Sequence, residues 1–145
     1  MDKIKKNKII WIDDDINSFP LMPYIDELED SDLFEIVGVA NPDDIEKSLA
    51  ENPDVKCIIV DISMPSGKSI PFQDAKGGMQ TGLLVLKKLV DDTSLKDVKK
   101  VVFTIVNNSE AREYCKIQQP EIPYLEKCQF LTERFVTKMN EIINS

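Results

Sequence analysis

Short apolar runs that stop at an acidic residue recur along this chain. Residues 57–60 are a cysteine, two isoleucines and a valine, and Asp61 follows them. The mainly apolar residues 8–12 are followed in the same way by Asp13. Continuous apolar runs of this length are typical of strands buried on both faces of a parallel sheet. Further runs of this kind occupy residues 34–39, 99–105 and 122–125, so the pattern predicts five strands.

Segments with apolar residues at helical spacing separate these runs. The clearest lies near the end of the chain, where one helix face collects Phe135, Val136, Met139, Ile142 and Ile143. Asn41 and Pro42 predict the start of another helix, because asparagine caps helices well and proline suits the first position. Other helices are expected over residues 21–28, 79–91 and 109–118. Five strands that alternate with five helices predict an α/β fold with a parallel sheet.

Composition narrows the class of protein. The 145 residues suffice for one domain, 1–145, with a substantial hydrophobic core. A formal net charge of −8 argues against a surface built for nucleic acid phosphates. No apolar run approaches the ~20 residues of a membrane span, and the charged N-terminus does not resemble a signal peptide. Three cysteines without a CxxC pair favour the reduced cytoplasm. We therefore expect a cytoplasmic protein that binds neither nucleic acid nor membrane.

Polar side chains with complementary chemistry follow the predicted strands. Asp13 and Asp14 follow the first strand and Asp61 follows the third, so their carboxylates are expected at the carboxyl edge of the sheet. Oxygen ligands of this kind suit Mg²⁺, which Mn²⁺ can replace. A carboxylate beside the metal can accept a phosphoryl group and become an aspartyl phosphate. Thr104 and Lys127, which end the fourth and fifth strands, can bind the phosphoryl oxygens.

These features, in this order, resemble the receiver domain of two-component response regulators. The resemblance covers nearly the whole chain and rests on Ile12-Asp13-Asp14, Asp61 with Met64-Pro65, Val102-Phe103-Thr104 and Lys127. It implies a stand-alone, chemotaxis-regulator-like receiver with a flavodoxin-like (βα)5 three-layer sandwich and a sheet of order 2-1-3-4-5. Such a domain is regulatory and not an enzyme, since it catalyses only its own phosphotransfer and dephosphorylation.

The resemblance also implies partners and a metal site. Asp61 would accept a phosphoryl group from a histidine kinase or a phosphotransfer protein, and a downstream protein target would respond to the modified state. Asp14, Asp61 and the backbone carbonyl of Ser63 would bind Mg²⁺ directly, and Asp13 would act through water. Signalling of this kind proceeds through protein–protein contacts.

Two residues near the phosphoryl-binding side depart from the receiver pattern. In receivers, Thr104 and Lys127 would contact the phosphoryl oxygens, and the rotamer of Tyr124 would follow Thr104. The residue after the threonine is usually small, whereas Ile105 is bulky and is expected to modulate access to the acceptor. Proline usually follows the lysine, but Cys128 stands there, so a cis peptide bond is not expected at this point.

The departures leave two alternatives open. A degenerate receiver would bind partners without phosphorylation, which Ile105 and Cys128 favour. A metal-dependent phosphohydrolase would use Asp61 as its nucleophile, but haloacid-dehalogenase-type enzymes carry a second acid two residues later, where this chain has Ser63.

The sequence also predicts an insertion-like loop over about 66–78, since βα loops are usually ~2–6 residues long.

Overall fold

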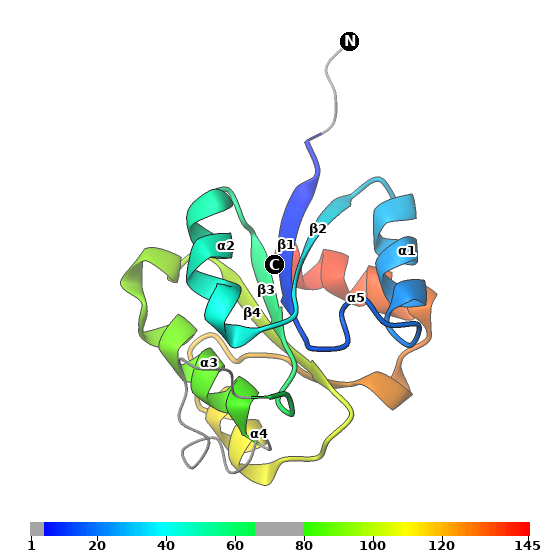
Figure 1. Ribbon diagram of the computed structural model, residues 1–145. Helices are drawn as coiled ribbons and strands as arrows, with labels where there is room; N and C mark the ends of the chain where they lie inside the picture. Colours follow the sequence, from blue (N-terminus) through cyan, green and yellow to red (C-terminus); the bar gives the residue numbers. More distant parts are fainter. Residues whose placement is uncertain (1–4, 66–79) are drawn as a thin grey trace.

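The protein is a five-stranded parallel sheet covered by helices on both faces (Figure 1). The computed structural model describes residues 5–65 and 80–145. The strand order is β2-β1-β3-β4-β5, which confirms the predicted order 2-1-3-4-5. The strands are β1 (Asn7–Ile12), β2 (Phe34–Val39), β3 (Cys57–Val60), β4 (Lys99–Thr104) and β5 (Tyr124–Glu126).

Two layers of helices enclose the sheet, as the flavodoxin-like prediction requires. Helices α1 (Met22–Asp30) and α5 (Thr132–Ile143) cover one face. Helices α2 (Ile45–Glu51), α3 (Thr81–Asp91) and α4 (Ser109–Lys116) cover the other. Three short 3-10 turns, at Pro42–Asp44, Thr93–Leu95 and Lys127–Gln129, precede or follow these elements. Among the described residues, no helix is long and apolar enough to cross a membrane.

Alternate residues of the central strands pack on opposite faces of the sheet. Ile10 and Ile12 of β1 belong to the core beneath α2, α3 and α4, whereas Ile9 and Trp11 belong to the core beneath α1 and α5. All four are fully buried. This two-sided burial explains why the central strands read as continuous apolar runs and not as alternating patterns.

The predicted helix and strand limits are close to those observed, and their differences have local causes. Asn41 caps the turn before α2, its side chain accepting a hydrogen bond from the amide of Asp43 at 2.9 Å. The fifth strand begins at Tyr124, later than the predicted residue 122. Pro123 has no amide hydrogen and contributes only its carbonyl, which accepts from Val102 at 2.9 Å. The predicted loop 66–78 and the predicted helix start at residue 79 lie outside the described residues.

A glycine lets α3 approach the end of β3. The Gly82 amide donates to the carbonyl of Ile62 at 2.8 Å. A Cβ atom at Gly82 would lie 1.9 Å from the carbonyl oxygen of Asp61 and 2.5 Å from the Cα of Ile62. Both atoms are backbone, so neither can rotate away. The position of the backbone after β3 therefore depends on glycine at this place.

We predict that Gly82→Ala destabilises the fold by about 3 kcal/mol, the upper end of typical overpacking costs, although alanine is the better helix former. Gly38→Ala is the matched control. A Cβ there meets mainly the side chain of Ile16, at 2.8 Å, which can adjust. Its expected cost is about 1 kcal/mol. Urea unfolding of both variants measures the difference, and equal costs would contradict the close-packing argument.

Candidate functional site

Four of the predicted site residues meet at the carboxyl edge of the sheet, on the lower side of Figure 1. The Lys127 amine donates to Asp13 Oδ2 at 2.8 Å and to Asp61 Oδ2 at 3.3 Å. The Thr104 hydroxyl donates to Asp61 Oδ1 at 2.6 Å. Asp13, Asp61 and Thr104 are buried, and the Lys127 side chain is nearly so. We refer to these four residues as the acidic site.

The register of the parallel strands brings the acidic site together. Ile12 of β1 pairs with Val60 of β3, so the next residues, Asp13 and Asp61, leave neighbouring strands at the same level. The Asp61 amide donates to the carbonyl of Ile12 at 3.0 Å, which continues this pairing to Asp61 itself. On the other side, Thr104 of β4 pairs with Glu126 of β5, directly before Lys127.

Burial and charge set the protonation of the site. Burial, and then the charge of Asp61, raise the pKa of Asp13 to about 6, although the Lys127 amine opposes the rise. Burial acts to lower the pKa of Lys127, but the carboxylates of Asp61 and Asp13 outweigh it and the net pKa is raised. The amine is therefore held in its charged form between two carboxylates.

The donors at this edge fit a hard divalent cation. Carboxylate oxygens of Asp13, Asp14 and Asp15 lie within 4.8 Å of one another. Burial, followed by the charges of Asp15 and Asp13, raises the pKa of Asp14. Mg²⁺ binds through one or two carboxylates and keeps several waters, which suits the exposed Asp14 beside the buried Asp13.

Asp15 was not among the predicted site residues. Its amide donates to Asp13 Oδ1 at 2.9 Å and so helps to hold that carboxylate, while its own carboxylate joins the cluster. The run of three aspartates was the available signal, but the sequence alone does not tell which of them face the site. Ser63, whose carbonyl was predicted as a ligand, lies half-buried two residues after Asp61.

Tyr124 is connected to Thr104 through the backbone after β4. The Thr104 hydroxyl accepts from the amide of Val106 at 3.4 Å, and the carbonyl of Val106 accepts from the Tyr124 hydroxyl at 2.7 Å. The guanidinium of Arg112 lies over the Tyr124 ring, 4.3 Å from its centroid, and forms an ion pair with Glu126. The half-buried tyrosine is thus fixed by contacts that also involve the segment after Thr104.

Ile105 lies outside the hydrophobic core, with 71% of its surface exposed. Ile105 is therefore not a core packing residue, and its predicted influence on access to Asp61 stays a prediction. The peptide bond after Lys127 is trans, as its cysteine predicted. Within the described ranges the one cis bond is Gln119–Pro120.

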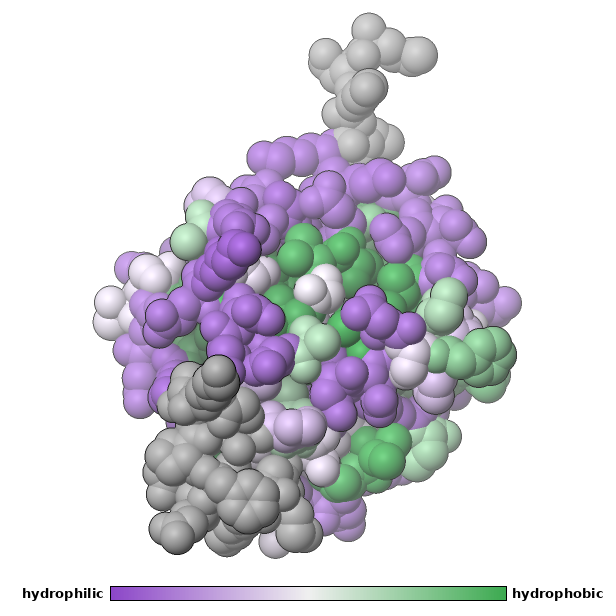
Figure 2. All heavy atoms as spheres, in the orientation of Figure 1, coloured by the Kyte–Doolittle hydropathy of each residue, from purple (hydrophilic) through white to green (hydrophobic). Residues whose placement is uncertain are grey.

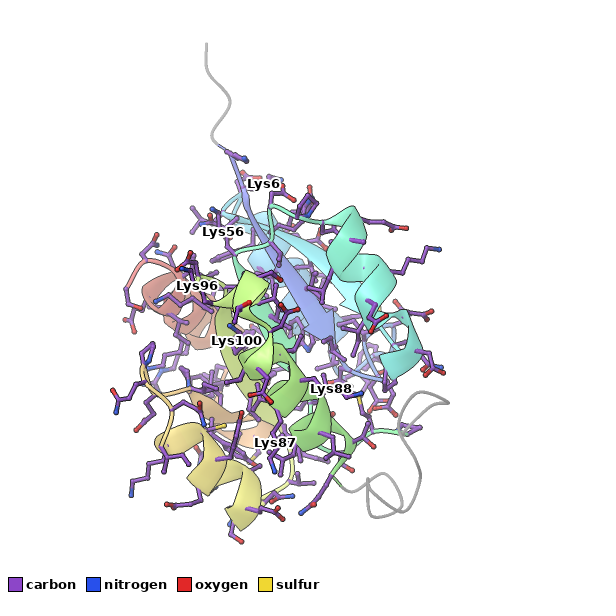
Figure 3. The ribbon with its side chains drawn as sticks, turned by 90° about the vertical axis from the view of Figure 1, so that its left-hand side faces the viewer. Lys6, Lys56, Lys87, Lys88, Lys96 and Lys100 are labelled. Carbon is purple, nitrogen blue, oxygen red and sulfur yellow. The ribbon has the colours of Figure 1, made fainter. Side chains whose placement is uncertain are left out.

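The Lys127 side chain is almost enclosed and its amine lies between two carboxylates. Figure 3 labels six other lysines, which are spread over the side of the molecule on which α3 lies. Lys56, Lys88 and Lys96 among them are exposed. Only 13% of the Lys127 side chain is exposed, and its amine touches two carboxylates from different strands. Such placement is typical of a lysine that belongs to a site and not of a solvated surface charge.

Receiver domains of response regulators are among the solved structures that superpose on this chain. The BeF3-activated DrrB receiver domain superposes with a TM-score of 0.65 at 14% identity, covering 97% of this chain and 100% of that chain. Chemotaxis response regulator CheY4 of Vibrio cholerae superposes with a TM-score of 0.66 at 16% identity, covering 95% and 99%. The fold is a receiver fold.

A third similar structure comes from a complex of two signalling proteins. A chain from the complex of the P1 domain of CheA3 with CheY6 of R. sphaeroides has a TM-score of 0.63 at 16% identity, with coverage of 98% and 100%. No protein-family model matches the sequence, and the comparison with curated proteins found no match. At identities this low, the superpositions demonstrate a shared receiver fold alone. The chemistry of the acidic site is a separate observation.

The raised pKa of Asp13 predicts a pH-dependent stability. Between about pH 4 and pH 6 the folded protein keeps a proton on Asp13 that the unfolded chain has lost, so this residue lowers stability as pH rises through that range. We expect Asp13→Asn, without divalent cations, to raise the unfolding free energy at pH 7.5 by about 1–3 kcal/mol. The advantage should shrink as pH falls toward 4.

Urea unfolding of the parent and Asp13→Asn at pH 7.5 and 4.5 measures this effect. Asp26→Asn, at an exposed position on α1, is the control for a general change of charge. A pH-independent difference between parent and Asp13→Asn, or a less stable variant at pH 7.5, would contradict the assignment.

Proposed function

We propose that this protein is a phosphoacceptor receiver that takes a phosphoryl group on Asp61. The observation that carries the proposal is the contact of both Asp61 oxygens with fixed donors, Thr104 on one side and Lys127 on the other. These donors keep the carboxylate oriented and can turn to phosphoryl oxygens once the group is attached. The receiver fold of the similar structures supports the same role.

In the proposed reaction, a carboxylate oxygen of Asp61 attacks the phosphorus of a phosphohistidine in line with the leaving nitrogen. The nitrogen–phosphorus bond breaks as the oxygen–phosphorus bond forms, and the electron pair stays on the imidazole, which takes a proton from water. The hydroxyl of Thr104 and the ammonium of Lys127 then donate to phosphoryl oxygens and stabilise their charge. In hydrolysis, a water oxygen attacks the phosphorus as the bond to the Asp61 oxygen breaks, which releases phosphate and restores the carboxylate.

Asp13, Asp14, Asp61 and the carbonyl of Ser63 would hold Mg²⁺. When bound, the ion would neutralise phosphoryl charge and the repulsion within the acidic cluster. The amine of Lys127, which now lies between Asp13 and Asp61, would then be free to bind the phosphoryl group. The site's donors thus have a role both before and after phosphorylation.

A histidine kinase or phosphotransfer protein is the proposed donor, in line with the P1 domain complex in which a similar chain occurs.

Apolar side chains are exposed close to the acidic site in sequence. Phe19 and Met22 follow β1, and Leu131 lies four residues after Lys127. Figure 2 shows apolar groups on the surface beside the beginning of α1. A protein partner could cover them.

The first experiment is intact-mass measurement after incubation with acetyl phosphate. We expect the parent to gain one phosphoryl group with Mg²⁺ and none with EDTA, because the acidic cluster repels an anionic donor unless a cation is bound. Asp61→Asn should gain none, and the exposed control Asp97→Asn should behave like the parent. Undiminished modification of Asp61→Asn would refute the acceptor assignment, and no modification of the parent would favour the degenerate receiver.

A second prediction concerns the lifetime of the phosphorylated form. If Ile105 limits the approach of water to Asp61, Ile105→Ala should speed dephosphorylation by about two- to tenfold, since in-line attack is sensitive to small displacements. Its stability should change by less than about 0.5 kcal/mol, because the side chain is exposed. Ile117→Ala, at another exposed isoleucine, is the control. An unchanged lifetime in Ile105→Ala would remove Ile105 from the site.

A further inference from the structure

A tyrosine on the first helix reaches the backbone that bears the site lysine. The Tyr24 hydroxyl lies 2.7 Å from the carbonyl oxygen of Phe130 and 3.2 Å from that of Lys127. Its single hydrogen donates mainly to Phe130 and is shared with Lys127. The two carbonyls bracket the 3-10 turn Lys127–Gln129. We propose that Tyr24 is a positioning residue that holds this turn so that the Lys127 amine reaches Asp13 and Asp61.

The Tyr24 ring is itself fixed by the core. It packs edge-on against Phe103 at 5.3 Å and against Phe135 at 5.5 Å between ring centroids. Phe103 is fully buried in β4 and directly precedes Thr104, and Phe135 is fully buried in α5. A hydroxyl on a ring held in this way has a defined position relative to the sheet. Tyr24 therefore fixes the position of the turn relative to the same strand that supplies Thr104.

The turn has few other anchors. Strand β5 is only three residues long and ends directly before Lys127. The side chains of Cys128 and Gln129 are exposed, so they do not tie the turn to the core. Cys128 also lacks the ring by which the proline usual in receivers would restrict the backbone. The bonds from Tyr24 supply a restraint at the point where the sequence departs from the receiver pattern.

The proposal makes a prediction that does not need phosphorylation. Tyr24→Phe keeps the ring and removes the hydroxyl, which should loosen the Lys127 amine from its carboxylates. Loss of one hydrogen bond of ordinary strength corresponds to about a fivefold change in an equilibrium. We therefore expect Lys127 to be acetylated about fivefold faster by a small amine-reactive reagent, relative to Lys138 on α5. Peptide mass measures the acetylation of both lysines.

Tyr114→Phe is the matched control. Tyr114 is a half-buried tyrosine on α4, and its hydroxyl makes no hydrogen bond to the described part of the chain. Its ring, which lies beneath the amine of Lys87, is retained in the variant. Lys127 labelling should be unchanged there. Equal labelling of Lys127 in the parent and Tyr24→Phe would overturn the proposal, whatever the outcome of phosphorylation.

A second experiment rests on the proposed function and separates a positioning role of Tyr24 from an effect on overall stability. Tyr24→Phe should slow phosphorylation by acetyl phosphate and Mg²⁺ by about fivefold. In a Lys127→Ala background, the same change should have almost no further effect, because the hydroxyl acts through Lys127. An equal slowing in both backgrounds would overturn the positioning role. If the parent is not phosphorylated at all, the proposed function fails, and the labelling result alone decides the role of Tyr24.

Discussion

The ammonium of Lys127 between the carboxylates of Asp13 and Asp61 is the interaction on which the site depends. Two carboxylates leave adjacent strands at the same level and are buried there, and this burial, followed by the charge of Asp61, raises the pKa of Asp13. The Lys127 ammonium between them compensates part of this charge. Removing the Lys127 amine would leave two buried carboxylates without a compensating cation, which is costlier than the paired arrangement.

The fold supplies the geometry that this ion pair requires. The order 2-1-3-4-5 places β1 and β3 side by side at the centre and brings the end of β5 next to β4. Gly82 lets α3 pack against the backbone after Asp61, and Tyr24 holds the backbone after β5. Restraints from both layers of helices therefore converge on residues that are far apart in the sequence. Positioning of this kind is the main contribution a protein can make to phosphoryl transfer, where the chemistry itself needs little covalent assistance.

Much of this arrangement could be predicted from the sequence because it depends on strong local patterns. Apolar runs buried on both faces define β1 and β3 within a residue or so, and parallel pairing then brings Asp13 and Asp61 to one edge. Thr104 and Lys127 follow from the same reasoning. The roles of Asp15 and Tyr24 could not be predicted, because they depend on how side chains and backbone from separate elements meet. The start of β5 was misplaced because the proline that precedes it pairs only through its carbonyl.

The most direct test of the account is to locate the modified residue chemically. Borohydride reduces an aspartyl phosphate to homoserine, so phosphorylated protein can be reduced, digested and mapped by peptide mass. The account predicts homoserine at position 61, dependent on Mg²⁺ and on the phosphodonor. Reduction at another aspartate, or a phosphorylated protein in which residue 61 remains an aspartate after reduction, would contradict the claim that Asp61 is the acceptor.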